Sequence, residues 1–218
     1  MSPRTDIGDT FEVIALNAGK PKTHDLNGRT WRTAYVKDPV DGPMHLGPEG
    51  LAGDDQADKK HHGGPDKALC VYPGDHYEFW MMQIGQQLDG AAFGENVTLD
   101  GLVEKDACIG DVFEWGEARV QISEPREPCA NIARRWGVSE LTEWVRESGF
   151  TGWYMRVLEP ADVSADQPWT LVERPHPEFS IAALNRLVDE PGRDLDAVHR
   201  LAELDVLGET WREKFGGE

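Results

Sequence analysis

A cysteine surrounded by arginines is the first feature of the sequence that could do chemistry. Residues 124–135 read EPREPCANIARR and place Cys129 shortly after Arg126, in a chain whose formal net charge is -18. Pro128 ends an extended segment and ANIARRWG can begin a helix, so the thiol is expected at a helix start, where free N–H groups favour the thiolate. Cys129 is therefore a candidate reactive or metal-ligating residue. A small apolar cysteine packed on a helix's inner face is the equal alternative.

The helical spacing decides which arginine accompanies the thiol. Cys129 shares its predicted face with Trp136, whereas Arg134 and Arg135 point elsewhere. We therefore expect Arg134 and Arg135 to form a solvated face, and Arg126 to be the cation beside the sulfur.

A second candidate lies in the segment KKHHGGPDKALCVY. The pair Gly63 and Gly64 permits backbone conformations closed to other residues, and it places His61, His62 and Lys67 on a tight loop. Such a loop can bind an anion through N–H groups and positive charge together. It lacks the GxxxxGK[ST] spacing of a nucleotide-hydrolysing loop, and adjacent histidines without a third ligand make a zinc site a weak alternative.

Other reactive residue types fit structural roles better. Cys70 and Cys108 resemble small hydrophobic residues in or beside strands, and the turn at Glu95 and Asn96 indicates backbone capping more than catalysis. The histidines His45, His76, His176 and His199 each stand alone in the sequence. No GxSxG, HExxH or GxGxxG motif occurs, which disfavours the commonest hydrolase, metalloprotease and dinucleotide-binding classes.

Composition limits the partners and the location. The 218 residues include 22 Lys and Arg against 40 Asp and Glu, a charge balance that repels nucleic acid polymers and anionic membrane surfaces. No apolar run approaches the ~20 residues that span a bilayer, and the first residues lack the apolar core of a signal peptide. We expect a cytoplasmic protein that is not bound to a membrane.

The elements that must position these residues are mostly strands. Strand patterns cover residues 11–18, 32–40, 68–72, 112–115, 118–122, 152–160 and 169–174, and helical patterns cover 76–84 and 139–149. Three helical stretches follow at 179–190, 194–204 and 208–215, with apolar residues spaced for one face. The sequence therefore predicts a mainly β fold with some α: an antiparallel β-barrel domain at 1–173, and a three-helix unit at 174–218 that packs on the barrel or on a second subunit.

Taken together, these segments resemble the MOSC domain family. The resemblance is carried in order by GLAGDDQAD, HHGGPDKALCVYPGDHY, FGENVTLDGL, IGDVFEWGEARVQISEPREPC and the helical tail. It implies a mostly antiparallel β-barrel that binds the molybdenum cofactor (molybdopterin), in a branch with a C-terminal three-helix unit. The implied molybdenum ligand is the cysteine of the PRxPC motif, Cys129, and the implied contacts to the pterin phosphate are His62, Gly63, Gly64, Lys67 and Arg126.

The same resemblance implies a reductase of N-hydroxylated small molecules such as hydroxylaminopurines. His62 is the expected proton donor, and the lack of a flavin or nicotinamide motif implies a separate electron-donor reductase. The alternative is a protein that carries molybdenum cofactor, or sulfur on Cys129, without turnover of its own. A homodimer is a further expectation. Where many relatives have an aromatic residue and a lysine after the cysteine, this chain has Ala130 and Asn131, so one cation is missing beside the implied site.

Overall fold

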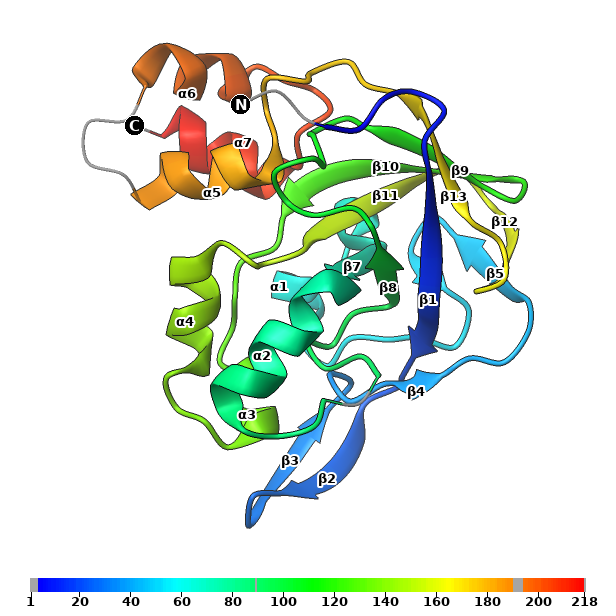
Figure 1. Cartoon of the computed structure of the whole chain (residues 1–218), viewed down its shortest axis with the longest axis vertical. Coiled ribbons are helices and arrows are strands. Elements are labelled where there is room, and N and C mark those ends of the chain that lie inside the picture. Colours follow the sequence, from blue (N-terminus) through cyan, green and yellow to red (C-terminus); the bar gives the residue numbers. More distant parts are fainter. Residues whose placement is uncertain (1–3, 89, 190–193, 218) are drawn as a thin grey trace.

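Seven strands close into a barrel in the computed structural model, which describes residues 4–88, 90–189 and 194–217 (Figure 1). In spatial order they are β13 (Trp169–Glu173), β9 (Val112–Trp115), β10 (Ala118–Pro125), β11 (Trp153–Glu159), β7 (Leu69–Pro73), β8 (Val97–Asp100) and β1 (Thr10–Ala18). β13 pairs back with β1, where Thr170 faces Thr10, and this pairing completes the barrel. Neighbouring strands are antiparallel except β7 and β8, which are parallel. The expected mainly β barrel with helices is confirmed.

Side-chain alternation explains why these strands form a barrel. β1 buries Phe11 and Val13 and exposes Glu12 and Ile14, the period-2 pattern of a strand with one buried face. A register shift between Val13 and Ala15 then brings Leu16 inside. Trp115 and Trp169 are fully buried, with ring centroids 5.4 Å apart. Large aromatic rings thus fill the interior, which makes the barrel a packed core.

A second apolar cluster fixes the outer face of β7. All five residues of β7 are buried, because α2 (Tyr77–Ile84), α3 (Asn131–Trp136) and α4 (Leu141–Ser148) pack with it around Tyr72, Trp80 and Ile132. The helices predicted at 76–84 and 139–149 are confirmed as α2 and α4. This cluster also anchors α3, which follows Cys129 directly.

The strand predicted at 32–40 is wrong. β3 (Arg29–Thr33) ends early, because the Thr33 hydroxyl accepts a hydrogen bond from the backbone N–H of Tyr35 at 2.9 Å and turns the chain. Only β4 (Asp38–Pro39) continues as strand. β3 instead pairs with β2 (Lys22–Leu26) in a hairpin that projects from the barrel beside α3 (Figure 1). The period-2 pattern missed this break because a single side-chain bond causes it.

Short elements complete the barrel domain. A three-stranded sheet joins β12 (Ala161–Val163), β5 (Met44–Gly47) and β6 (Gly50–Leu51). The segment before β7 contains α1 (Lys59–His62) and the single turn η1 (Pro65–Lys67), and η2 (Gly74–His76) leads into α2. The expected loop at residues 59–67 is therefore largely helical.

Three helices end the chain: α5 (Ile181–Asp189), α6 (Leu195–Ala202) and α7 (Glu209–Gly216). Trp211 and Phe215 are buried as expected, whereas Leu195, also expected inside, is 60% exposed because it opens α6 directly after the capping residue Asp194. Glu190, the last residue of the first predicted C-terminal helix, lies outside the described residues.

The helices share one continuous hydrophobic core with the barrel, so they pack on it rather than depending on a second subunit. The domain boundary at 173/174 stays a prediction, as does a homodimer. Among the helices of the described ranges, none has the length and apolarity needed to cross a bilayer.

Candidate functional site

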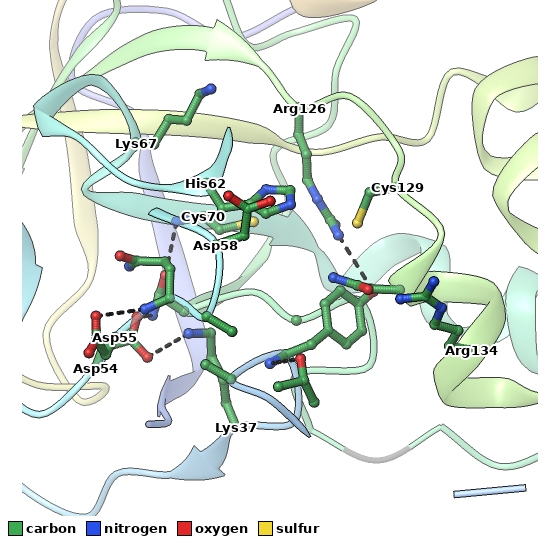
Figure 2. A pocket seen from close by; sticks show the side chains of 18 of the residues that line it. Lys37, Asp54, Asp55, Asp58, His62, Lys67, Cys70, Arg126, Cys129 and Arg134 are labelled. Carbon is green, nitrogen blue, oxygen red and sulfur yellow. Dashed lines mark hydrogen bonds and ion pairs between the residues drawn. The ribbon is translucent and has the colours of Figure 1, made fainter. Parts of the chain in front are cut away.

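A cavity of about 380 Å³ opens between α1, β7, the segment after β3 and the start of α3. Four of the six residues implied for the site line it: Cys129, Arg126, His62 and Lys67 (Figure 2). Gly63 and Gly64 do not. The cavity therefore joins the cysteine motif to the histidine and lysine of the second segment, more than 60 residues away in the sequence.

Arg126 carries a buried charge without a counter-ion. Its residue is 4% exposed, and its Nη2 donates to the carbonyl oxygen of Phe93 at 2.5 Å and lies 3.5 Å from the Tyr35 hydroxyl. Its Nη1 is buried with no hydrogen-bond partner. Within residues 4–88, 90–189 and 194–217, no carboxylate forms an ion pair with it. A buried guanidinium in this condition favours an anion in the cavity.

The other ionisable groups beside Arg126 do not supply that anion. Burial raises the pKa of the Cys70 thiol to about 11 and raises the pKa of both the Tyr35 and Tyr154 phenols well above 10. All three are therefore neutral near pH 7. Cys70 was expected to be an inert small hydrophobe, and its burial at 7% exposure agrees.

Cys129 lies just before α3 rather than within it. Its carbonyl oxygen accepts bonds from the Ile132 N–H at 3.1 Å and from the Thr142 hydroxyl at 3.3 Å, and the residue is half-buried at the cavity wall. In Figure 2 the sulfur lies beside the guanidinium of Arg126. The expected pairing of this thiol with Arg126 therefore has a geometric basis.

Arg134 and Arg135 differ from the expected solvated pair. Arg134 is exposed, but it lines the cavity. Arg135 is buried, with its guanidinium 5.2 Å from the centroid of the Trp136 ring and Nη2 donating to the carbonyl oxygen of Gly90 at 3.3 Å. The prediction from helical spacing was wrong because Cys129 precedes α3, so the direction of the Cys129 side chain does not follow the helical period. Arg134 supplies a cation near Asn131, where the sequence lacks the usual lysine.

His62 ends α1 and faces the cavity, whereas its neighbour His61 turns outward to Asp58, 2.8 Å away. Burial, followed by the charge of Arg126, lowers the pKa of His62 below its ordinary 6.5, so its imidazole is mainly neutral at pH 7. Gly63 is extended, and a Cβ there would lie 2.8 Å from the carbonyl oxygen of Lys59. In the structure this glycine relieves crowding against α1, and its implied contact to the pterin phosphate stays a prediction.

Lys67 lines the cavity but already has a partner. Its Nζ donates to the carbonyl oxygen of His61 at 3.0 Å and lies 3.4 Å from the carboxylate of Glu124. In Figure 2 the ammonium points to the upper edge of the view, away from Arg134. Burial raises the pKa of Glu124 to about 7, and Lys67 opposes this only in part. Sequence reasoning missed Glu124, although it lies in the opening motif EPREPC.

Two further charged residues that line the cavity, Lys37 and Asp54, have a structural role. Lys37 forms a buried 2.5 Å ion pair with Asp54, which also accepts bonds from the Gly19 N–H and the Asn96 side chain. Asn96 also accepts a bond from the Cys70 N–H at 3.1 Å, so the expected backbone capping by Asn96 is observed. These groups are satisfied and hold the cavity's shape.

The MOSC domain matches residues 58–170, a range that contains His62, Lys67, Arg126 and Cys129. The chain belongs to the MOSC domain family. MOSC domains are associated with molybdenum cofactor binding.

Relatives match along nearly the whole chain. The uncharacterized protein YflK of Bacillus subtilis is 42% identical over 95% of this chain and 94% of its own. The crystal structure of YiiM from Geobacillus stearothermophilus matches with a TM-score of 0.81 and 34% identity, over 95% of this chain and 98% of that chain. A protein named reductase from Gibberella moniliformis is 30% identical over 89% of this chain, which corresponds to 35% of the reductase. The expected branch with three C-terminal helices is thereby confirmed.

The residues at the cavity fit such a cofactor. Cys129 offers a soft sulfur donor at the wall, and the unpartnered Nη1 of Arg126 offers a buried donor to an anionic oxygen. Arg134 adds an exposed positive charge at the same cavity. A sulfur donor beside cations and an uncompensated positive charge suits a metal held by a phosphorylated ligand.

Proposed function

We propose that this protein is a molybdenum cofactor-dependent reductase of N-hydroxylated compounds, with Cys129 as the protein ligand of molybdenum. The observation that carries the proposal is the pairing of a half-buried thiol with Arg126, whose charge is buried without a counter-ion among the described residues. A cysteine packed as a core hydrophobe requires neither feature.

Each residue has a defined task in this proposal. Cys129 binds as the thiolate, Arg126 donates from Nη1 to an anionic oxygen of the ligand, and Arg134 adds charge at the rim. Lys67 would contact a phosphate only after leaving Glu124. Tyr35 and Cys70 stay neutral and close the inner wall, which limits water around the sulfur.

The reaction is a two-electron reduction in which R–NHOH, two electrons and two protons give R–NH2 and water. The cofactor supplies the oxygen-accepting, two-electron chemistry when it is bound. His62 holds and transfers a proton at its ring nitrogen, since it is the histidine that faces the cavity. Electrons come from a separate reductase, and hydroxylaminopurines are the proposed substrate type. The reductase name of the Gibberella moniliformis relative supports the oxidoreductase class without naming a substrate.

Metal content and turnover test the proposal together. Wild type purified from a host that makes the cofactor should contain molybdenum and, with a reduced viologen as electron donor, reduce an N-hydroxylated purine. Molybdenum without turnover for any N-hydroxylated compound would replace the enzyme with the carrier alternative. Wild type lacking both would refute each.

The matched variants are Cys129→Ala and Cys108→Ala. Cys108 is fully buried and does not line the cavity, so its variant should keep the metal. Cys129→Ala should lose it while folding normally, at a cost of about 1–3 kcal/mol. Equal molybdenum in the two variants would rule out ligation by Cys129.

A further inference from the structure

Six arginines form no ion pair in the described part of this chain, although it has 40 acidic residues and a net charge of -18: Arg4, Arg29, Arg32, Arg126, Arg134 and Arg186. Four of the six, Arg29, Arg32, Arg126 and Arg134, line either the Cys129 cavity or a second cavity of about 480 Å³. Unpaired cations gathered in one place of an acidic protein mark an anion site.

The second cavity lies between the β2–β3 hairpin and α3. It is lined by Asn27, Arg29, Thr30, Trp31, Arg134 and Ser139, with Leu26, Ala133 and Gly137, and no acidic residue contributes to it. The hairpin and α3 lie side by side in Figure 1. The groove thus offers two guanidinium groups, those of Arg29 and Arg134. Its two hydroxyl groups already have partners, since Thr30 donates to Asp25 at 2.8 Å and Ser139 donates to Glu140 at 2.7 Å.

Two hydrogen bonds from the Asn27 side chain set the width of this cavity. The side-chain N–H groups of Asn27, at the hairpin turn, donate to the carbonyl oxygens of Arg134 at 3.1 Å and Arg135 at 3.2 Å. Gly137, with φ of +69°, permits this approach, because a Cβ there would lie 2.9 Å from the Asn27 side chain. The hairpin is therefore held against the end of α3 and the groove is a built feature.

Trp31 and Arg134 connect the two cavities, since both residues line each of them. Trp31 is half-buried, and its ring centroid is 6.0 Å from that of Tyr35, which in turn contacts Arg126. An indole face can stack a planar heterocycle, while arginines bind a phosphate with paired N–H donors. An aromatic ring joined to a phosphate matches this combination better than either part alone.

We propose that the groove between the β2–β3 hairpin and α3 binds the nucleotide part of a ligand, with its base against Trp31 and its phosphate at Arg29 and Arg134. Two sources share this chemistry: a dinucleotide form of the cofactor, and an N-hydroxylated substrate presented as its nucleoside monophosphate. The hairpin lies outside residues 58–170 matched by the MOSC domain. The alternative in which the substrate is the nucleotide rests on the proposed function. Nucleotide binding to the cofactor-free protein does not depend on that function.

Isothermal titration calorimetry of adenosine 5′-monophosphate with cofactor-free protein tests whether the groove binds a nucleotide. The monophosphate should bind at least about tenfold more tightly than adenosine or inorganic phosphate. Arg29→Ala and Trp31→Ala should each weaken it by about tenfold, and Trp31→Phe should restore most of the loss. Arg200→Ala is the control, because Arg200 is exposed on α6 and pairs with Glu178. Equal affinity for monophosphate and phosphate, or Arg29→Ala equal to Arg200→Ala, would overturn the proposal.

Two measurements on molybdenum-loaded protein separate the sources. Mass spectrometry of the released cofactor shows whether it carries a nucleotide. The KM of an N-hydroxylated nucleoside monophosphate should lie below that of its free base, and Arg29→Ala should remove the difference, if the substrate is the source. A cofactor without a nucleotide together with equal KM values would reject both. If wild type purified from a host that makes the cofactor contains no molybdenum but still binds the monophosphate, the proposed function is refuted and the groove proposal stands.

Discussion

Replacing Glu124 with glutamine should remove a large part of the pH dependence of stability. This carboxyl group is 2% exposed and faces the start of α7, and its Oε2 has no hydrogen-bond partner. Lys67 at 3.4 Å offsets part of its buried charge. Burial nevertheless raises the pKa of Glu124 from 4.5 to about 7, so the native protein retains a proton that the unfolded chain releases.

The sign and size of the effect follow from this difference in pKa. Between pH 4.5 and 7 the native state binds more protons than the unfolded state, so the free energy of unfolding falls as the pH rises through this window. Each pKa unit corresponds to about 1.4 kcal/mol, which gives a loss of about 3 kcal/mol by pH 8. Glu124→Gln lacks this loss. Its stability relative to wild type should therefore increase by about 3 kcal/mol from pH 4 to pH 8.

Urea denaturation across this pH range, followed by tryptophan fluorescence, measures the difference. Glu127→Gln is the control, because Glu127 is exposed, pairs with Lys214 and lies near Glu124 in the sequence. Its difference from wild type should stay nearly constant with pH. A Glu124→Gln difference that is equally constant would show that the buried carboxyl does not titrate as reasoned.

Three further predictions follow from named contacts. Gly208→Ala should destabilise the fold by about 1–3 kcal/mol in thermal unfolding, because its Cβ would lie 2.2 Å from Oε2 of buried Glu124, and an unchanged Tm would contradict this packing. Because the pKa of His62 is lowered, turnover that uses its proton should rise as the pH falls below 6.5, and His62→Gln should flatten this pH profile of turnover. Equal slopes of the wild-type and variant profiles would show that His62 is not the proton donor. Arg174→Met should cost about 3–5 kcal/mol in urea denaturation, since it leaves Asp111 buried at 0% exposure without its 2.6 Å partner, and a loss under about 1 kcal/mol would refute this.

Local patterns explain which parts of the fold were predictable. The hairpin at β9 and β10 and the helices α2 and α4 each depend on a continuous period in the sequence. The pairing of Cys129 with Arg126 was predictable for the same reason, since three positions separate them. Features set by neighbours in the chain could therefore be inferred from the sequence.

The rest depends on contacts between distant segments. The Thr33 side-chain bond ends β3, and no periodicity reports such a bond. Lys67 meets Glu124 because η1 packs against β10, and Arg134 lines the cavity although the helical spacing predicted that it points elsewhere. Each misplacement arose where tertiary packing, rather than local propensity, directs a side chain.

The unpaired charge of Arg126 connects ligand binding to stability. An overall charge of -18 repels anions at long range, so the cavity gains little from electrostatic steering. Its selectivity must come from short-range donors, chiefly a guanidinium that keeps an unfilled hydrogen bond when no anion is present. That buried charge destabilises the ligand-free protein, and an anion placed against Nη1 relieves the cost. Anion binding in the cavity should therefore raise the unfolding temperature, and Arg126→Met should abolish this gain while leaving the ligand-free protein equally or more stable.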